Sequence, residues 1–87
     1  MTEFTVRLEN AEGLHARPAA VMVKLASQFQ SKIEIKAKGQ VKNAKSLMSL
    51  LSLGLEKGDE IQIIAQGEDG AAAASALQKL IQNQFAE

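Results

Sequence analysis

The sequence has no cysteine, no tryptophan and no tyrosine, and its 87 residues include one histidine and one proline. Without cysteine the chain can form neither a disulfide nor a thiolate metal site, which fits a reducing compartment. Three phenylalanines are the only aromatic residues, so we expect an aliphatic core. The aromatic platforms on which single-stranded nucleic acids stack are missing as well.

The charge is balanced, with ten basic and ten acidic residues. Generic nucleic-acid binding needs a concentrated basic excess, so we expect no nucleic-acid partner. No apolar run approaches the roughly 20 residues of a membrane-spanning helix, and the N-terminus lacks the apolar stretch of a signal peptide. We therefore expect a cytoplasmic protein that does not insert into membranes and that forms one domain over residues 1–87.

Hydrophobic periodicity predicts four strands and three helices. The strands are expected over residues 4–8, 33–38, around 41 and 61–65, and the helices over residues 16–29, 47–53 and, after Gly67, as far as residue 85. Ser46 is expected to cap the short helix and Gly54 to end it. Strands with one apolar face predict an α+β fold in two layers, a mainly antiparallel sheet with helices on one side.

One segment contains an unusual set of residues. Residues 13–18 read Gly-Leu-His-Ala-Arg-Pro and contain the only histidine, the only proline and one of the two arginines. Proline is tolerated in the first turn of a helix, so His15 is expected at or near the N-cap and Arg17 just after it. Imidazole is a poor cap, and a cation in the first turn opposes the helix dipole. Such a helix start suits an incoming anion.

The chemistry of this segment favours a phosphoryl group. The first N–H groups of a helix have no acceptor within the helix, and the dipole adds positive charge, so the helix start can bind phosphate. Arg17 can add a bidentate contact to phosphate oxygens. A neutral imidazole is a nucleophile. A phosphoryl group on His15 could therefore rest against the backbone amides of Ala16 and Arg17.

Other interpretations of the histidine remain open at this point. A lone histidine in a small protein is often a surface or capping residue. A zinc site lacks a second histidine or a cysteine to complete its ligands. A hydrolytic triad lacks a recognisable nucleophile motif.

Two segments resemble those of a known family. Residues 13–18 resemble the active-site signature of HPr, the histidine-containing phosphocarriers of the bacterial sugar phosphotransferase system. Residues 43–48, Asn-Ala-Lys-Ser-Leu-Met, followed by Leu53 and Gly54, resemble the serine segment of that family. The resemblance covers essentially the whole chain. It implies an open-faced β-sandwich of order βαββαβα, in which three helices cover one face of a four-stranded antiparallel sheet.

The resemblance also implies roles for residues. Enzyme I, charged from phosphoenolpyruvate, phosphorylates the histidine of these proteins on Nδ1, and the group then passes to IIA domains of sugar permeases. By this likeness His15 is the phosphoryl carrier, Ala16 and Arg17 stabilise the phosphate, and Pro18 fixes the helix start. The chain would be a monomeric carrier, without metal or cofactor, that turns over no small molecule on its own.

Ser46 has two interpretations. Its residue type and position favour an N-cap. In Gram-positive members of the family the matching serine is phosphorylated by HPr kinase/phosphorylase and then supports binding to a catabolite-control repressor. Those members usually have glycine after the methionine, whereas this chain has Ser49.

The short helix carries more apolar residues than one buried face can hold. Helical geometry separates Leu50 and Leu53 from a second group of Leu47, Met48 and Leu51. Either all five are core because neighbouring loops cover the second group, or one group is an exposed patch of the kind that binds partners. The resemblance selects the second group as the docking surface, with Lys24 adding charge at its rim.

Two other functions remain open. A regulatory docking module of the same fold would act through Ser46, although such relatives lack the histidine. A phosphocarrier of the nitrogen-related branch would share the histidine but serve different partners.

Overall fold

The computed structural model describes residues 1–86. Within that range four strands and three helices follow one another in the predicted order. The strands are β1 (Thr2–Arg7), β2 (Lys32–Ala37), β3 (Gln40–Asn43) and β4 (Glu60–Gln66), and the helices are α1 (Ala16–Ala26), α2 (Leu47–Leu51) and α3 (Gly70–Gln82).

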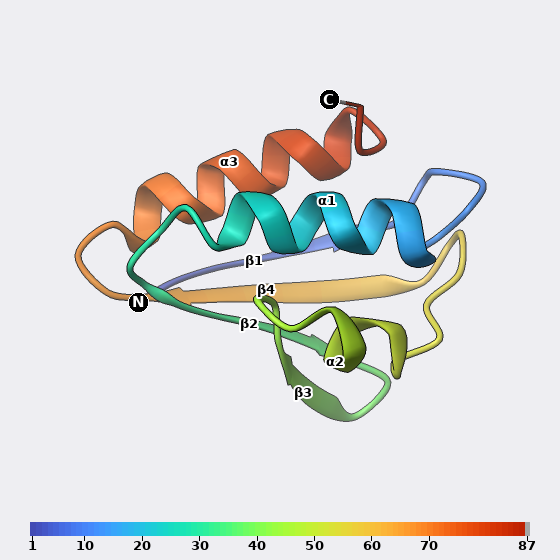
Figure 1. Cartoon of the computed structure of the whole chain (residues 1–87), viewed down its shortest axis with the longest axis horizontal. Helices are drawn as coiled ribbons and strands as arrows, with labels where there is room; N and C mark the ends of the chain where they lie inside the picture. The colour runs from blue at the N-terminus through green and yellow to red at the C-terminus, as the bar shows by residue number, and fades with distance from the viewer. Residues whose placement is uncertain (87) are drawn as a thin grey trace.

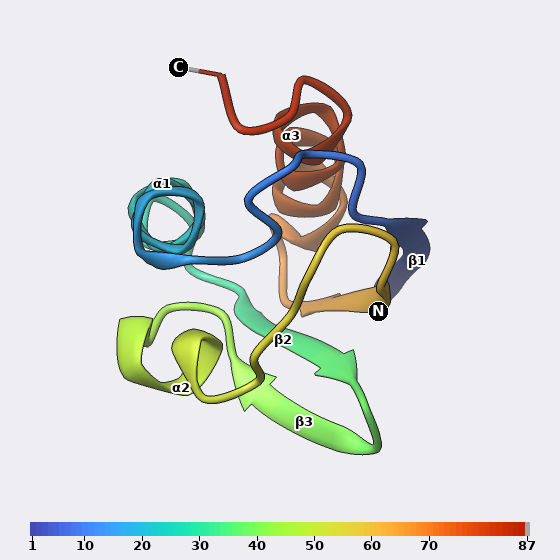
Figure 2. The same cartoon turned by 90° about the vertical axis from the view of Figure 1, so that its right-hand side faces the viewer.

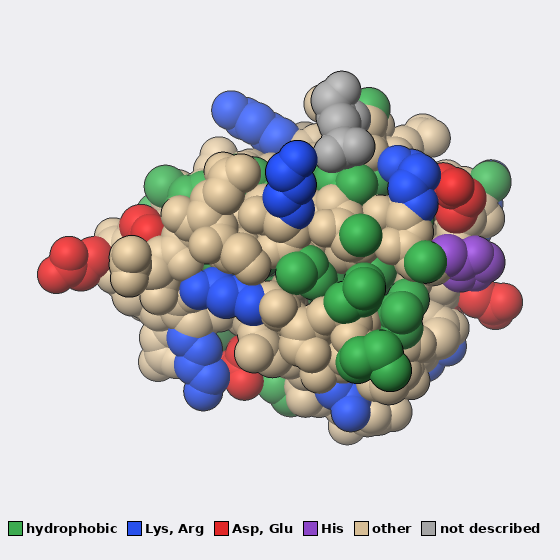
Figure 3. Space-filling model, viewed as in Figure 1, with side chains coloured by type: hydrophobic (Ala, Val, Ile, Leu, Met, Phe, Trp, Pro, Cys, Tyr) green, Lys and Arg blue, Asp and Glu red, His purple; other side chains and the backbone are tan. Residues whose placement is uncertain are grey.

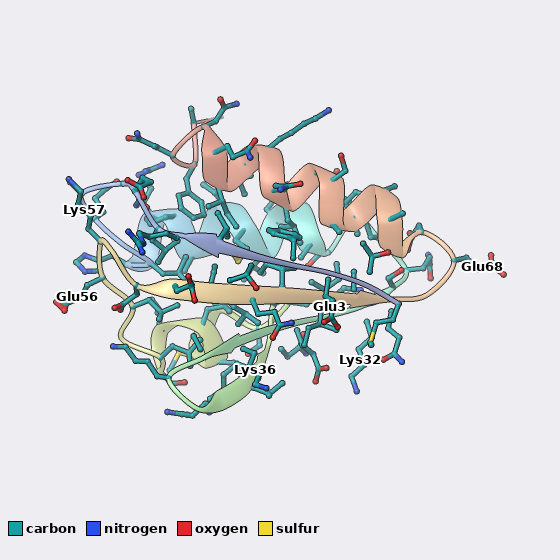
Figure 4. The ribbon with its side chains drawn as sticks, turned by 180° about the vertical axis from the view of Figure 1, so that it is seen from behind. Glu3, Lys32, Lys36, Glu56, Lys57 and Glu68 are labelled. Atoms are coloured by element: carbon teal, nitrogen blue, oxygen red, sulfur yellow. The ribbon has the colours of Figure 1, made fainter. Side chains whose placement is uncertain are left out.

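The strands form one antiparallel sheet in the order β1-β4-β2-β3. Ile63 of β4 lies opposite both Phe4 of β1 and Ile35 of β2, so the apolar side chains share one face. All three helices cover that face (Figure 1), and Figure 2 shows α1 and α3 nearly end-on above it. Glu3, Lys32 and Lys36 extend from the uncovered face (Figure 4). The predicted two-layer α+β fold is confirmed.

The core lies between the sheet and the helices, and it is aliphatic as predicted, with one exception. Phe85 is fully buried, beyond the end of α3. The other fully or nearly fully buried large side chains include Leu14, Met22, Ile33, Ile35, Leu50, Ile61, Ile63 and Leu77. None of the helices in the described part of the chain has the length and apolar character needed to cross a membrane.

Helix α1 ends at Ala26, three residues earlier than predicted. The N–H groups of Gln28 and Phe29 bond to carbonyls three residues back, which tightens the last turn. The Asp69 carboxylate then accepts hydrogen bonds from the backbone N–H groups of Gln30 and Ser31. These contacts divert the chain from the helical path into β2.

Helix α2 is also shorter than predicted, because it ends at Leu51 with Ser52 as its C-cap. The N–H groups of Leu53 and Gly54 bond to carbonyls three residues back, so the coil continues as a tighter turn. Gly54 has the expected left-handed backbone, with φ of 60°.

Helix α3 ends at Gln82 rather than continuing to residue 85. The Phe85 N–H donates to the Leu80 carbonyl at 2.8 Å and the Gln84 N–H to the Ile81 carbonyl at 3.0 Å, the two bonds of a Schellman motif. Gln84 takes the left-handed position that glycine usually fills, with φ of 55°. The motif folds Phe85 back into the core and brings its carbonyl toward α1.

Candidate functional site

His15 is the N-cap of α1, as predicted, and its side chain is exposed. The residue has an extended backbone, with φ of −80° and ψ of −170°, and its side chain makes no capping hydrogen bond. The His15 carbonyl accepts the first helical bond, from the N–H of Ala19 at 2.9 Å. The ring is therefore held at the helix start without serving as its cap.

The loop before His15 fixes the position of the ring. Leu14 is buried, and its N–H donates to the Leu55 carbonyl at 3.1 Å. Gly13 has φ of +63°, and a Cβ there would lie 2.5 Å from the Leu55 oxygen and 2.6 Å from the Glu56 Cα. Only glycine fits this close approach of two loops. Buried Asn10 closes the turn by donating from Nδ2 to the Gly13 carbonyl at 2.7 Å.

The first turn of α1 contains Ala16, Arg17 and Pro18 in succession. Pro18 is the third helical residue and is buried, so it helps to fix the helix start and supplies no N–H. Ala16 is exposed. No acidic residue lies in this turn, so the positive end of the dipole faces solvent without a carboxylate of the helix itself.

Among the described residues, Arg17 binds the Glu12 carboxylate and the Phe85 carbonyl, neither of which the sequence indicated. Its Nη2 donates to Glu12 Oε1 at 2.8 Å and its Nε to Glu12 Oε2 at 3.4 Å, while Nη1 donates to the Phe85 carbonyl at 3.2 Å. The hydrogen bond from Arg17 lowers the pKa of Glu12 below its ordinary value, and burial opposes this in part. The acidic side chain of Glu12, directly before residues 13–18, was the one sequence signal that could have indicated a partner for Arg17. No sequence signal indicated the Phe85 carbonyl.

Ser46 is the N-cap of α2, and its Oγ accepts from the Ser49 N–H at 3.3 Å. The capping interpretation is thus confirmed by the structure. The side chain is only half-buried and is followed at once by the two most exposed residues of the helix.

The apolar residues of α2 and of the turn that follows it divide as helical geometry predicts. Leu50 and Leu53 are buried, whereas the exposed fraction is 38% for Leu47 and 76% for Met48, and Leu51 is half-buried. Figure 3 shows apolar side chains gathered over α1 and α2, reaching as far as the histidine. An apolar patch therefore adjoins the imidazole.

Lys24 lies in the last turn of α1. It borders a shallow hollow of about 240 Å³, together with Val21, Leu25, Gln28 and Leu80 of α3. It therefore belongs to the side of α1 that faces α3.

The site offers a nucleophile and hydrogen-bond donors rather than a set of metal ligands. Within residues 1–86 no three histidine, aspartate or glutamate side chains gather closely enough to hold a metal ion. The exposed imidazole, the helix start and the guanidinium are the groups that phosphate recognition uses.

Comparison with known proteins assigns the chain to a family. Residues 2–83 match the family model described as PTS HPr component phosphorylation site. The chain belongs to the HPr family. It is a phosphocarrier of the phosphotransferase system.

Relatives and solved structures agree with this assignment. The chain is 43% identical to phosphocarrier protein HPr of Treponema pallidum, over 100% of this chain and 99% of the relative. It is 45% identical to the multiphosphoryl transfer protein of Vibrio cholerae, over 84% of this chain and 19% of that longer protein. The crystal structure of HPr-C-His from Thermoanaerobacter tengcongensis matches with a TM-score of 0.96 and 42% identity, over 100% of this chain and 98% of that chain.

Proposed function

We propose that His15 is the residue that carries the phosphoryl group. The observation that carries the proposal is an exposed imidazole at the N-cap of α1 that makes no capping hydrogen bond, two residues from a guanidinium. In the transfer, the lone pair of one ring nitrogen attacks phosphorus as the bond from phosphorus to the donor breaks. The other ring nitrogen keeps its proton. The family resemblance assigns the attack to Nδ1.

The start of α1 would stabilise the transferred group. The backbone amide of Ala16 and that of Arg17 are at the positive end of the helix, where an anion is favoured. The Arg17 guanidinium can form charge-assisted bonds to phosphate oxygens. Pro18 would contribute by fixing the first turn.

The proposed partners are phospho-enzyme I as donor and the IIA domains of sugar permeases as acceptors. In-line transfer needs docking that aligns the two reacting groups and then releases. The side chains of Leu47, Met48 and Leu51 support this role because they are apolar and exposed or half-buried on α2. Figure 3 shows that the apolar surface over α1 and α2 reaches as far as the histidine. Lys24, in the last turn of α1, is proposed as a charged contact that lies farther along the helix from His15. The chain would act as a monomer and would turn over no small molecule by itself.

Ser46 is proposed as a regulatory site, as a second function of the same surface. The half-buried hydroxyl caps α2 directly before Leu47 and Met48. A phosphate there would add charge at the edge of the docking patch and could still accept hydrogen bonds at the helix start. HPr kinase/phosphorylase and a catabolite-control repressor are the corresponding partners.

Labelling with phosphoenolpyruvate and enzyme I tests the carrier. The wild type is expected to gain one acid-labile, base-stable phosphate and the His15→Ala variant none. Ser46→Ala is the matched control and should be labelled like the wild type. Labelling that persists in His15→Ala would refute the assignment.

Exchanging Met48 tests the docking surface. Because this side chain is largely exposed, Met48→Ser should weaken binding to enzyme I and leave the unfolding transition unchanged. Leu50→Ala, on the buried side of the same helix, should instead destabilise the fold by about 2–5 kcal/mol. Equal binding by wild type and Met48→Ser would exclude Met48 from the interface.

A further inference from the structure

The guanidinium of Arg17 donates hydrogen bonds to Glu12 and to the Phe85 carbonyl within the described residues. Glu12 receives hydrogen bonds from Nε and Nη2, which form one edge of the planar group, and the Phe85 carbonyl receives one from Nη1. The paired side chains of Glu12 and Arg17 are each about half exposed. The ion pair is therefore accessible to solvent and to an incoming anion.

The edge that Glu12 occupies is suited to bidentate recognition. An arginine binds a carboxylate or a phosphate through two parallel N–H groups on one edge, and it cannot present the same two groups to both anions. A phosphoryl group on His15 that uses this edge must displace Glu12. The Nη1 contact to Phe85 involves a different nitrogen and can persist through the exchange.

The charges point in the same direction. Glu12 lies close enough to His15 for a positive charge on the imidazole to help lower the pKa of its carboxyl group. After transfer the imidazole bears a phosphoryl group with up to two negative charges. The same carboxylate is then beside a like charge, which is unfavourable.

We propose that Glu12 is an exchangeable counter-ion of Arg17 that positions the guanidinium while His15 is unmodified and yields it to the phosphoryl group. Glu12 thus stabilises the unphosphorylated form relative to the phosphorylated form. It raises the tendency of the phosphoryl group to leave for the next acceptor. This inference rests on the proposed role of His15.

A competition between two forms of the protein tests the proposal. Wild type and the Glu12→Gln variant, one of them labelled with ¹⁵N, are mixed with a limiting supply of phosphoryl groups and a catalytic amount of enzyme I. Mass spectrometry then gives the share of each that is phosphorylated at equilibrium. We expect the phosphoryl group to favour Glu12→Gln by about threefold, the scale of an exposed ion pair. An equal partition would overturn the proposal.

Two further variants test whether Glu12 acts through Arg17. Glu9→Gln makes the same change of charge in the same loop and should partition equally with wild type. In the Arg17→Ala background, Glu12→Gln should lose its preference, because the group that it releases is gone. A preference that persists there would overturn the counter-ion role and leave simple repulsion between Glu12 and the phosphoryl group.

A spectroscopic measurement is independent of transfer rates. In the unphosphorylated protein, Glu12→Gln should shift the NMR resonance of the Arg17 Nε–H group, and Glu12→Asp should restore part of the wild-type position. An unchanged resonance would contradict the ion pair. The two failures can be told apart. If the wild type takes up phosphate at a residue other than His15, the proposed function is wrong. If His15 is phosphorylated but phosphate divides equally between wild type and Glu12→Gln, only the role of Glu12 is wrong.

Discussion

Glu12 and Asp69 are both carboxylates whose pKa is lowered by hydrogen bonds, and they lie near opposite ends of the molecule. Glu12 precedes Gly13, which packs against Glu56 at one end, while Asp69 follows Glu68 at the other (Figure 4). The pKa of Glu12 is lowered mainly by the Arg17 side chain. The pKa of Asp69 is lowered mainly by the Ser31 hydroxyl and then by the backbone N–H of Gln30.

The two carboxylates differ in what holds their partners. Asp69 binds backbone N–H groups at 2.8 and 2.9 Å and the hydroxyl of buried Ser31, so its two backbone donors cannot move without moving the loop. Gly67 closes this end further, because a Cβ there would lie 2.6 Å from the Ser31 Oγ. Within residues 1–86, Glu12 forms its side-chain hydrogen bonds with the guanidinium of Arg17, a long side chain that is about half exposed. Similar hydrogen bonds thus hold the Asp69 carboxylate on the backbone near one end of the molecule and form the exchangeable Glu12–Arg17 ion pair near the other.

The largest expected effect on phosphoryl transfer comes from removing Arg17, the partner of Glu12 in the exchangeable ion pair. Arg17→Ala should slow phosphoryl transfer about a hundredfold, the scale of losing one positioned donor to a developing charge, and leave the melting temperature nearly unchanged. Stopped-flow transfer from phospho-enzyme I measures the rate. Arg7→Ala, the other arginine, exposed on β1, is the control and should transfer normally. Equal rates for the two variants would remove Arg17 from the mechanism.

Removing the Asp69 carboxylate should affect the stability of the fold rather than the rate of phosphoryl transfer. Asp69→Ala removes the acceptor for Gln30 and Ser31, so we expect the melting temperature to fall by about 5 °C or more, measured by calorimetry. Glu68→Ala, the exposed neighbour, should change it little. Transfer at a temperature where both variants are folded should match wild type. A transfer defect specific to Asp69→Ala would show that the two ends are coupled.

The smallest expected effect is the acid dependence of this stability. The native pKa of Asp69 lies below its ordinary value of 3.8, so its contribution is complete above that pH and is lost as the pH falls through the native value. The difference in unfolding free energy between wild type and Asp69→Ala should therefore shrink below about pH 4. Denaturant titrations between pH 2 and 6 measure it. A difference that stays constant over that range would show that ionisation of Asp69 does not matter.

Local sequence patterns were enough to predict the order of the elements and the place of His15. Alternation of apolar residues defined the strands, and Pro18 limited where the first helix could begin. The helical repeat separated Leu50 from Met48, and the resemblance to the HPr family then selected the group of Met48 as the exposed one. Each of these depends on neighbours a few residues away.

The parts that sequence reasoning missed depend on contacts between distant segments. The bonds from Gln30 and Ser31 to Asp69 join residues that are 39 and 38 positions apart, respectively, and they end α1 early. The Arg17–Phe85 bond joins residues 68 positions apart through a Schellman motif that lacks its usual glycine. Glu12 and Arg17 are near in sequence, but no helical spacing relates them because a tight turn at Gly13 separates them.

NMR spectroscopy of the protein before and after phosphorylation tests the central claim most directly. The account predicts that phosphorus becomes bonded to a ring nitrogen of His15 and that the backbone amides of Ala16 and Arg17 show the largest changes in chemical shift. Phosphorus on any other residue, or largest changes away from the start of α1, would contradict it.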